Sequence, residues 1–342
     1  MKKALVAMSG GVDSSVSALI MKNEGYECIG ATMQLFEKDS RDVDDAKAVC
    51  DRLGIPFIVL DCREEFEEKV ISSFISSYEN GETPNPCLVC NKYLKFGLMI
   101  DKALELGCDC VVTGHYARIE EKDGKFLLKK ALDPAKDQSY VLYSLTQHQL
   151  KHTRFPLGEM SKEQARTMAQ EKGFVNSDRP DSQDICFVPD GDYVKFIKDK
   201  TGKTYPEGNF VDLQGNILGK HKGIINYTIG QRKGLGLALP EPMYVADKNV
   251  ELSEVVLALN HQLFKRELYA KDFNWVSGTE PDGEIRINAK VRYRHTEQPA
   301  TAKVTEDGTV KIVFDEPQRA ITKGQAVVLY DGDTVVGGGT II

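Results

Sequence analysis

The 342-residue sequence lacks any apolar run that approaches the length of a membrane-spanning helix. At its start, Lys2 and Lys3 precede only five apolar residues before a glycine turn, which is too few for the core of a signal peptide. We therefore expect a cytoplasmic protein with no membrane partner. Eight cysteines are too few for a disulfide scaffold in a chain of this length, so some of them are expected to be reactive or to bind metal.

An excess of basic residues is also absent. The chain has 44 Lys and Arg against 51 Asp and Glu, and the resulting net charge of −7 weighs weakly against a nucleic-acid partner. Net charge misleads where charges are segregated, and here the first 80 residues are rich in acid while the basic clusters come later. The length and the 41% hydrophobic content fit a globular protein of two or three domains.

The first glycine turn matches neither the Walker A loop nor the G-x-G-x-x-G dinucleotide motif. Here Ala4–Met8 is followed by SGGVDSS at residues 9–15 and then by an amphipathic stretch. A strand, a glycine turn and a helix N-terminus in this order can hold a phosphate with backbone N–H groups. Gly10 and Gly11 permit a positive φ and close approach of an anion, the serines add hydroxyl donors, and Asp13 offers a carboxylate for Mg²⁺. The alternative is a serine-rich helix cap after a buried strand.

The SGGVDSS segment resembles the pyrophosphate loop of the ATP pyrophosphatases. Those enzymes split ATP between its α and β phosphates and adenylate an oxygen of their substrate. The resemblance therefore implies ATP and Mg²⁺, but it does not identify the substrate that is activated.

Apolar runs alternate with helical patterns from residue 1 to about 115, which predicts a parallel sheet covered on both faces, with ligands at the carboxyl ends of its strands. A further helix is expected from Ser161, because Gln164 stands in capping-box spacing. The expected strands are Lys3–Met8, Glu27–Gln34, Pro56–Asp61 and Asp109–Thr113, and the expected helices are Asp13–Glu24, Asp42–Leu53, Arg63–Tyr78 and Asn91–Leu106.

Beyond about Lys200 the sequence changes to short alternating segments broken by glycines, a pattern typical of β structure. We expect three domains: a Rossmann-like α/β domain of the ATP pyrophosphatase type at residues 1–200, a small β-rich domain at 201–267 and a C-terminal β-barrel at 268–342. The expected barrel strands are Glu284–Arg294, Thr301–Thr305, Thr309–Phe314, Gln325–Tyr330 and Thr334–Ile342.

Three of the eight cysteines stand apart. Cys87 and Cys90 form a C-x-x-C motif after two prolines, where we expect a helix to start at about Asn91. The helix dipole and Lys92 would then lower the thiol pKa, whereas a structural zinc site would need four ligands. Cys186 lies in the polar segment DSQDICF. The other five, Cys28, Cys50, Cys62, Cys108 and Cys110, are expected to be small buried hydrophobes.

Oxygen activation by ATP, together with two or three reactive sulfurs, points to replacement of oxygen by sulfur. Six blocks then occur in order: SGGVDSS, TPNPCLVCNKYLKF, TGHYAR, KDQSYVLYSL, DSQDICF and TIGQRKGLG. They resemble the signature blocks of the bacterial tRNA-specific 2-thiouridylases, and VRYRH and KGQAVVLY extend the match over essentially the whole chain. This resemblance implies adenylation of O2 of the wobble uridine in glutamate, glutamine and lysine tRNAs. Sulfur delivered as a cysteine persulfide would then displace AMP.

The same resemblance implies roles for individual residues. Cys90 matches the nucleophile of the family and Cys186 its persulfide carrier, and the residues from 201 to 267 would form a tRNA-contacting domain. Asn85, Pro86 and Cys87 would abut the target base. The residues expected to bind ATP are Ala7, Met8, Ser9, Gly10, Gly11, Val12, Asp13, Ser14, Met33 and Gly114, and those expected to contact tRNA are His115, Lys136, Asp137, Gln138, Arg292, Tyr293 and Gln325.

Cys87 departs from the form in which many members carry Asp at this place. With a third cysteine at this place, two sulfur intermediates stay open: a cysteine persulfide, or an iron–sulfur cluster held by Cys87, Cys90 and Cys186. The expected partners are tRNA and a sulfur donor, which could be a cysteine desulfurase, a sulfur relay protein or inorganic sulfide.

Alternation within Glu284–Arg294 offers separate support for tRNA, because it would place four basic residues on one face of a strand: Arg286, Lys290, Arg292 and Arg294. The alternative interpretation is an ordinary solvated face. Two rival functions also stay open. One is a synthetase of the ATP pyrophosphatase type that acts on a small molecule, and the other is a non-catalytic protein that binds tRNA or carries an iron–sulfur cluster.

Overall fold

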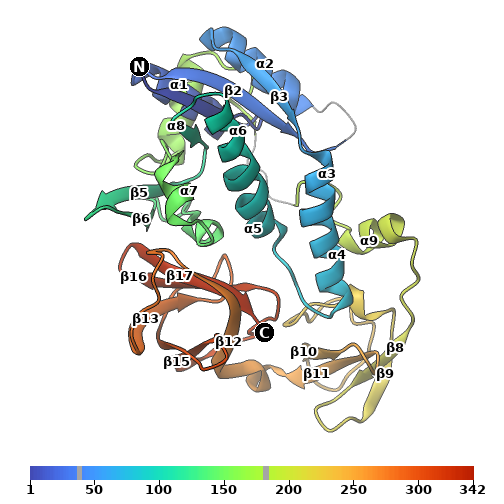
Figure 1. The fold of residues 1–342 in the computed structure, drawn as a ribbon. Coiled ribbons are helices and arrows are strands. Elements are labelled where there is room, and N and C mark those ends of the chain that lie inside the picture. Colours follow the sequence, from blue (N-terminus) through green and yellow to red (C-terminus); the bar gives the residue numbers. More distant parts are fainter. Residues whose placement is uncertain (37–40, 180–184) are drawn as a thin grey trace.

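The computed structural model describes residues 1–36, 41–179 and 185–342, so the DSQD part of the Cys186 segment lies outside the described residues. Three β-structured parts follow one another along the chain: a parallel α/β sheet, a four-stranded sheet and a β-barrel (Figure 1). The expected fold class is confirmed. In the part of the chain that is described, we find no helix long and apolar enough to cross a membrane.

The N-terminal sheet is parallel throughout, with strands in the order β3-β2-β1-β4-β7. Its central strand β1 is buried because its residues are apolar on both faces, as a doubly covered parallel sheet requires. The strands are β1 (Lys3–Ala7), β2 (Glu27–Gln34), β3 (Phe57–Asp61), β4 (Cys110–Val112) and β7 (Thr153–Arg154), and the helices packed around them include α1 (Val12–Asn23), α2 (Arg41–Leu53), α6 (Met99–Glu105) and α8 (Lys162–Glu171). The two-residue β7 was not expected.

Two long helical arms lead from this sheet toward the β domains (Figure 1). Each arm joins short α-helices through a π-helical segment. The first comprises α3 (Arg63–Glu65), η1 (Phe66–Ile71) and α4 (Ser72–Glu79), and the second comprises α5 (Pro86–Cys90), η2 (Asn91–Leu98) and α6. Wide turns of this kind are frequent at functional sites.

The second arm begins at Pro86, so the expected start at about Asn91 is wrong. Pro86 occupies the first helical position, where a missing N–H costs nothing and the fixed φ suits the helix. Asn85 is the N-cap, and its Oδ1 accepts a hydrogen bond from Cys87 N at 3.1 Å. The segment Asn85-Pro86-Cys87 is therefore a helix start.

The second sheet has the order β10-β11-β8-β9 and is reached through α9 (Tyr193–Thr201). Its strands are β8 (Gly208–Val211), β9 (Ile217–His221), β10 (Met243–Asn249) and β11 (Glu254–Leu259). Its apolar side chains belong to the same hydrophobic cluster as Phe66 and Phe74 of the first helical arm.

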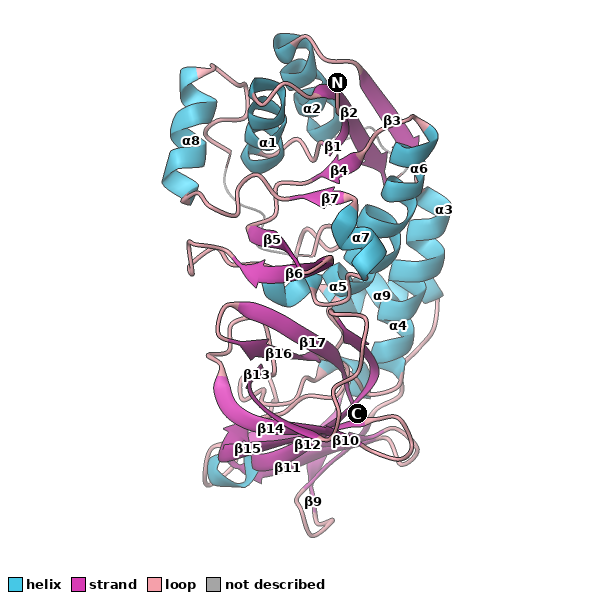
Figure 2. Ribbon diagram, turned by 60° about the vertical axis from the view of Figure 1, so that its left-hand side comes forward, coloured by secondary structure: helices cyan, strands magenta, loops and turns pink. Residues whose placement is uncertain are grey.

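The C-terminal part is a closed six-stranded barrel, because β12 pairs with both β15 and β17 (Figure 2). A hairpin of β5 (Ala117–Lys122) and β6 (Lys125–Lys130) from the α/β part joins its sheet at Thr334. The barrel strands are β12 (Phe264–Trp275), β13 (Glu284–Lys290), β14 (Gln298–Val304), β15 (Val310–Arg319), β16 (Ala326–Asp331) and β17 (Thr334–Ile341). The remaining short helices are η3 (Ser139–Leu142), α7 (Gln147–Lys151), η4 (Ile224–Asn226) and η5 (Asn260–Leu263).

Candidate active site

The glycine loop leaves β1 at the carboxyl edge of the parallel sheet. Gly10 has a φ of +72°, as its sequence context predicts, and Gly11 is the N-cap of α1. The hydroxyls of Ser14 and Ser15 each donate to Gly11 O at 3.0 Å, so these two groups stabilise the loop. The N–H groups in the first turn of α1 have no acceptors within the helix, which leaves them suited to bind phosphate.

Asp13, in this first turn, is bound by two groups that the sequence did not associate with it. Lys162 Nζ lies 2.7 and 2.8 Å from the two carboxylate oxygens, and Tyr116 Oη donates to Oδ1 at 2.9 Å. The Lys162 side chain is only 11% exposed. An amine buried to this extent needs a paired charge, and Asp13 supplies it. The loop thus has a cation beside its helix N-terminus.

The residues after β4 pack directly on this loop. A Cβ atom on Gly114 would lie 2.7 Å from the carbonyl carbon of Asp13 and 2.8 Å from Ser14 N, so the close approach requires glycine. Met33 lies near the carboxyl end of β2 and is half-buried. These positions are consistent with the predicted ATP site, whose residues Ala7–Ser14, Met33 and Gly114 come from the same edge of the sheet.

His115, which the sequence predicts to contact tRNA, is buried rather than exposed on the surface. The residue is 8% exposed, its ring lies near the rings of Phe96 and Phe155, and Nδ1 is 2.7 Å from Thr113 Oγ1. Burial, followed by the charge of Lys95, lowers its pKa well below the usual 6.5. His115 is therefore neutral at physiological pH, and its contact with tRNA stays a prediction.

A second anchor joins the glycine loop to the segment that leads toward Cys186. Asn176 Nδ2 donates to Gly10 O at 2.8 Å and to Ser15 Oγ at 3.0 Å, and Arg179 Nη1 also donates to Gly10 O. Arg179 in turn pairs with Asp42 of α2. The glycine loop and the start of the segment toward Cys186 are therefore held together.

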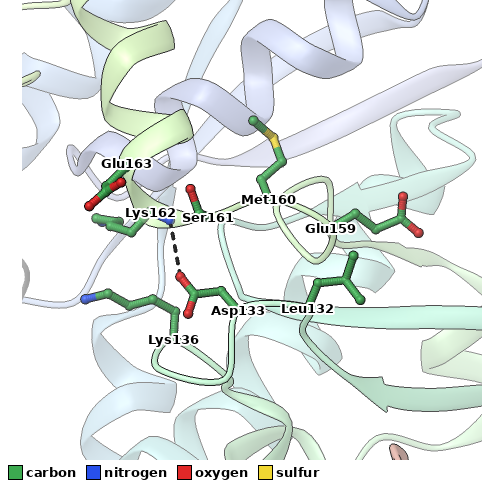
Figure 3. A pocket seen from close by; sticks show the side chains of 8 residues that line it. All are labelled: Leu132, Asp133, Lys136, Glu159, Met160, Ser161, Lys162 and Glu163. Carbon is green, nitrogen blue, oxygen red and sulfur yellow. Dashed lines mark hydrogen bonds between the residues drawn. The ribbon is translucent and has the colours of Figure 1, made fainter.

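A cavity of about 510 Å³ lies beside the start of α8 (Figure 3). In the wall of this cavity, Asp133 accepts a hydrogen bond from Lys162 N at 3.4 Å. The described lining includes Lys136, predicted to contact tRNA, and none of the predicted ATP residues. It comprises Leu132, Asp133, Lys136, Glu159, Met160, Ser161, Lys162 and Glu163. Lys162 connects this cavity to the glycine loop through Asp13.

The three cysteines that stood apart in the sequence lie in one electrostatic environment. Cys87 and Cys186 are exposed, Cys90 is half-buried, and the other five cysteines are buried, as expected. Burial raises the pKa of Cys90, whereas Lys95 lowers it and Cys87 raises it further. The expected lowered pKa at Cys90 is therefore wrong in the resting protein, and the nearby cation is Lys95 rather than Lys92.

Lys95 is a site residue that the sequence reasoning missed. The charge of Lys95 lowers the pKa values of Cys90, Cys186 and His115. Lys95 lies in η2, five residues after Cys90, which is the N-cap of η2, and i→i+5 hydrogen bonding in a π-helix brings such residues to one side. The π-helical segment was not apparent from the sequence.

Cys186 should react slowly with alkylating agents near neutral pH. Although Cys186 is exposed as a residue, partial desolvation of its thiol, together with the neighbouring Cys90 and Cys87, raises its pKa to about 11, and only the thiolate is nucleophilic. The rate of iodoacetamide labelling at Cys186, followed by peptide mass spectrometry, should rise about tenfold per pH unit up to at least pH 9. A plateau below pH 8 would contradict a raised pKa.

The described residues contain no group of three or more His, Cys, Asp or Glu side chains arranged to hold a metal ion. Cys87, Cys90 and Cys186 all lie within the described chain, so their present arrangement does not fit an iron–sulfur cluster. Mg²⁺ is a different case, because it takes one or two carboxylates together with phosphate oxygens. Asp13 fits that requirement if Lys162 moves from it.

Two segments predicted to contact tRNA meet although they come from different domains. Tyr293 Oη donates a hydrogen bond to Asp137 O at 3.3 Å. Desolvation raises the pKa of Tyr293, and Asp137 and Cys87 raise it further. The Asp137 carboxylate accepts from Ser139 Oγ at 2.8 Å, and Gln138 Oε1 accepts from Tyr116 N at 2.9 Å. These side chains shape the loop, and their contacts with tRNA stay predictions.

The expected basic strand face is wrong, because β13 ends at Lys290. Arg286 is paired with Asp315, and Lys290 is desolvated near the ring of Tyr140, which lowers its pKa. Arg292 and Arg294 instead lie in an exposed bend and turn after the strand. Any basic surface next to β13 is therefore formed by Arg292 and Arg294 in the turn, and not by a strand face.

Three family models match successive parts of the chain. They are described as the tRNA methyl transferase HUP domain at residues 2–190, the tRNA methyl transferase PRC-barrel domain at 194–258 and the aminomethyltransferase beta-barrel domain at 265–341. The tRNA-specific 2-thiouridylase MnmA of Clostridioides difficile is 52% identical, with 99% of this chain and 98% of the relative covered. The protein of the same name from Acetivibrio thermocellus is 50% identical, with 99% of each covered.

A solved structure of a 4-thiouridine synthetase–RNA complex with bound ATP is 16% identical and reaches a TM-score of 0.38, covering 59% of this chain and 50% of that chain. That overlap is too small for a conclusion about this protein. The full-length relatives are named for thiolation, whereas the family models carry methyl transferase in their descriptions.

Proposed function

The chain belongs to the family of tRNA-specific 2-thiouridylases, and from this premise we propose that it uses ATP to replace O2 of the wobble uridine by sulfur in glutamate, glutamine and lysine tRNAs. The enzyme would be a tRNA-uridine 2-sulfurtransferase. Its substrates, tRNA and ATP, favour a cytoplasmic location.

The first half-reaction would take place at the glycine loop. Uridine O2 attacks the α-phosphorus of ATP, the bond from that phosphorus to the bridging oxygen breaks, and pyrophosphate leaves. The N3 proton of the base passes to solvent in this step and returns when 2-thiouridine is released. The N–H groups at the start of α1 would hold the phosphates, and Lys162 would offset the charge that develops on pyrophosphate. Asp13 holds the amine of Lys162 beside the loop, and once Lys162 turns from it toward the phosphates this carboxylate would hold Mg²⁺, which would supply further positive charge.

The second half-reaction would use Cys186 and Cys90. The terminal sulfur of a persulfide on Cys186 attacks C2 of the adenylated uridine, and AMP leaves with the former O2. The Cys90 thiolate then attacks the Cys186 sulfur, the bond between Cys186 and the transferred sulfur breaks, and a Cys90–Cys186 disulfide forms as 2-thiouridine is released. A dithiol reductant restores both thiols, and the sulfur donor reloads Cys186.

The observation that carries this proposal is the common electrostatic environment of Cys90 and Cys186. These residues come from distant parts of the chain, yet both interact with Lys95, which also acts on His115 beside the nucleotide loop. Met33, Cys90 and Ile185 further belong to one hydrophobic cluster. This shared packing supports the proposal that the nucleotide and sulfur reactions take place close to each other.

The proposal is tested by measuring AMP and pyrophosphate release with and without tRNA. Release that requires a tRNA carrying uridine at the wobble position is expected. Release at the same rate without tRNA would instead support a synthetase acting on a small molecule, and no release under any condition would support a non-catalytic carrier. The full-length relatives support neither of these alternatives.

Binding of tRNA should depend steeply on salt despite the acidic net charge, because phosphate contacts release counterions. Replacing both Arg292 and Arg294 by alanine should weaken tRNA binding and lower the slope of log K against log salt by about 1.5 to 2. ATP affinity should stay unchanged. Filter binding across a salt series measures both quantities.

The matched control is Arg286→Ala, because the guanidinium of Arg286 is already paired with Asp315. This variant should bind tRNA as the unchanged protein does. If the double variant at Arg292 and Arg294 keeps its dissociation constant at moderate salt, the turn after β13 does not contact tRNA.

A further inference from the structure

The segment Gly81–Thr83 joins the end of α4 to Asn85, the cap of the helix that carries Cys87 and Cys90. The barrel binds this segment on one side. Thr83 N donates to Lys323 O at 2.9 Å, and Gln325 Nε2 donates to Thr83 O at 2.7 Å. Both main-chain polar groups of Thr83 are therefore bonded to the turn that precedes β16.

The approach of the barrel is close at this point. A Cβ atom on Gly324 would lie 2.8 Å from Glu82 Cβ and 3.0 Å from Thr83 N. No larger residue than glycine fits there without displacing the Gly81–Thr83 segment. The barrel turn and the segment are thus in direct contact.

The central domain binds the same segment from its other side. Lys248 Nζ of β10 donates to Tyr227 O at 2.9 Å and reaches Glu82 O at 3.5 Å. Burial lowers the pKa of Lys248 to about 8. Burying an amine against main-chain carbonyls costs free energy. The fold keeps this contact despite the cost, and the contact limits the movement of the Gly81–Thr83 segment. Val250 also lies against Gly81.

We propose that Gln325 and Lys248 are positioning residues, which hold the Gly81–Thr83 segment between the barrel and the central domain and thereby set the positions of Cys87 and Cys90. The inference rests on the proposed sulfur transfer for its consequence, but not for its geometry. It gives Gln325 a task within the protein in place of the tRNA contact predicted from the sequence.

The test is the reactivity of Cys87 in the full chain without tRNA or ATP. Gln325→Ala and Lys248→Met should each change the iodoacetamide labelling rate of Cys87, measured by peptide mass spectrometry, by about three- to tenfold, the effect of one lost hydrogen bond. In 2-thiouridine formation, both variants should lower kcat and leave KM for tRNA unchanged. Circular dichroism checks that each variant folds, and either variant alone suffices for the test.

Gln298→Ala is the matched control, because the side chain of Gln298, in the same barrel, donates to Thr296 O rather than to Thr83 O. In this control variant, Cys87 should be labelled at the same rate as in the unchanged protein. If Gln325→Ala and Lys248→Met also leave the rate at Cys87 unchanged, the proposal is overturned. A raised KM for tRNA with unchanged labelling assigns Gln325 to tRNA instead. Because labelling needs no turnover, failure of the proposed function would be visible separately.

Discussion

Asp13→Ala should lower tRNA-dependent pyrophosphate release by about a hundred- to a thousandfold, the usual effect of losing a group that stabilises charge in the transition state. The substitution removes the carboxylate that holds Lys162 Nζ at 2.7 and 2.8 Å, and it removes the acidic side chain best suited to Mg²⁺ at the loop. Pyrophosphate release at saturating ATP and tRNA measures the effect.

Tyr116→Phe is the control for this prediction. It removes one hydrogen bond to Asp13 Oδ1 but leaves the carboxylate and Lys162 in place. We expect a reduction of less than about tenfold, because a single neutral donor is lost. Substantial AMP formation by Asp13→Ala would show that the first half-reaction does not need the Asp13 carboxylate, either to hold Lys162 or to hold a metal.

Cys90→Ser and Cys186→Ser should each abolish 2-thiouridine formation while pyrophosphate release persists. The persulfide route needs one cysteine to carry the terminal sulfur and another to resolve the linkage by thiol–disulfide exchange. Serine can do neither. The measurement is made anaerobically, with thiolated nucleoside and pyrophosphate quantified in the same reactions.

Cys87→Ser is the decisive comparison, because Cys87 lies in the same short helix as Cys90. On the persulfide route this variant should retain thiolation. A cluster would need all three thiolates as ligands and would bring iron and sulfide into anaerobically prepared protein. Complete loss of thiolation in Cys87→Ser, together with loss of iron, would overturn the persulfide route.

The sequence was most informative where local rules decide the structure. The apolar run before SGGVDSS predicted β1, the loop and α1 almost to the residue, since strand burial and glycine geometry act locally. The capping box of Ser161 and Gln164 was confirmed for the same reason. At Pro86 the predicted helix start is wrong, because a proline preceded by an Asn cap begins a helix rather than preventing one.

Contacts between distant segments could not be predicted in this way. Nothing near Lys162 in the sequence points to Asp13, and nothing near Gln325 points to Thr83, because each pair meets only through the tertiary fold. The strand β12, which closes the expected barrel by pairing with both β15 and β17, is not among the strands that the sequence predicts. Arg292 was assigned to a strand because alternation continued beyond Lys290, where the backbone turns.

The central claim is that this chain converts the wobble uridine of tRNA to 2-thiouridine. Its most direct test is mass analysis of tRNA nucleosides after incubation with the protein, ATP, Mg²⁺ and a sulfur source. The account predicts that 2-thiouridine derivatives appear at the wobble position of glutamate, glutamine and lysine tRNAs, and only when ATP is present. Unmodified uridine at that position after ATP has been converted to AMP and pyrophosphate would contradict it.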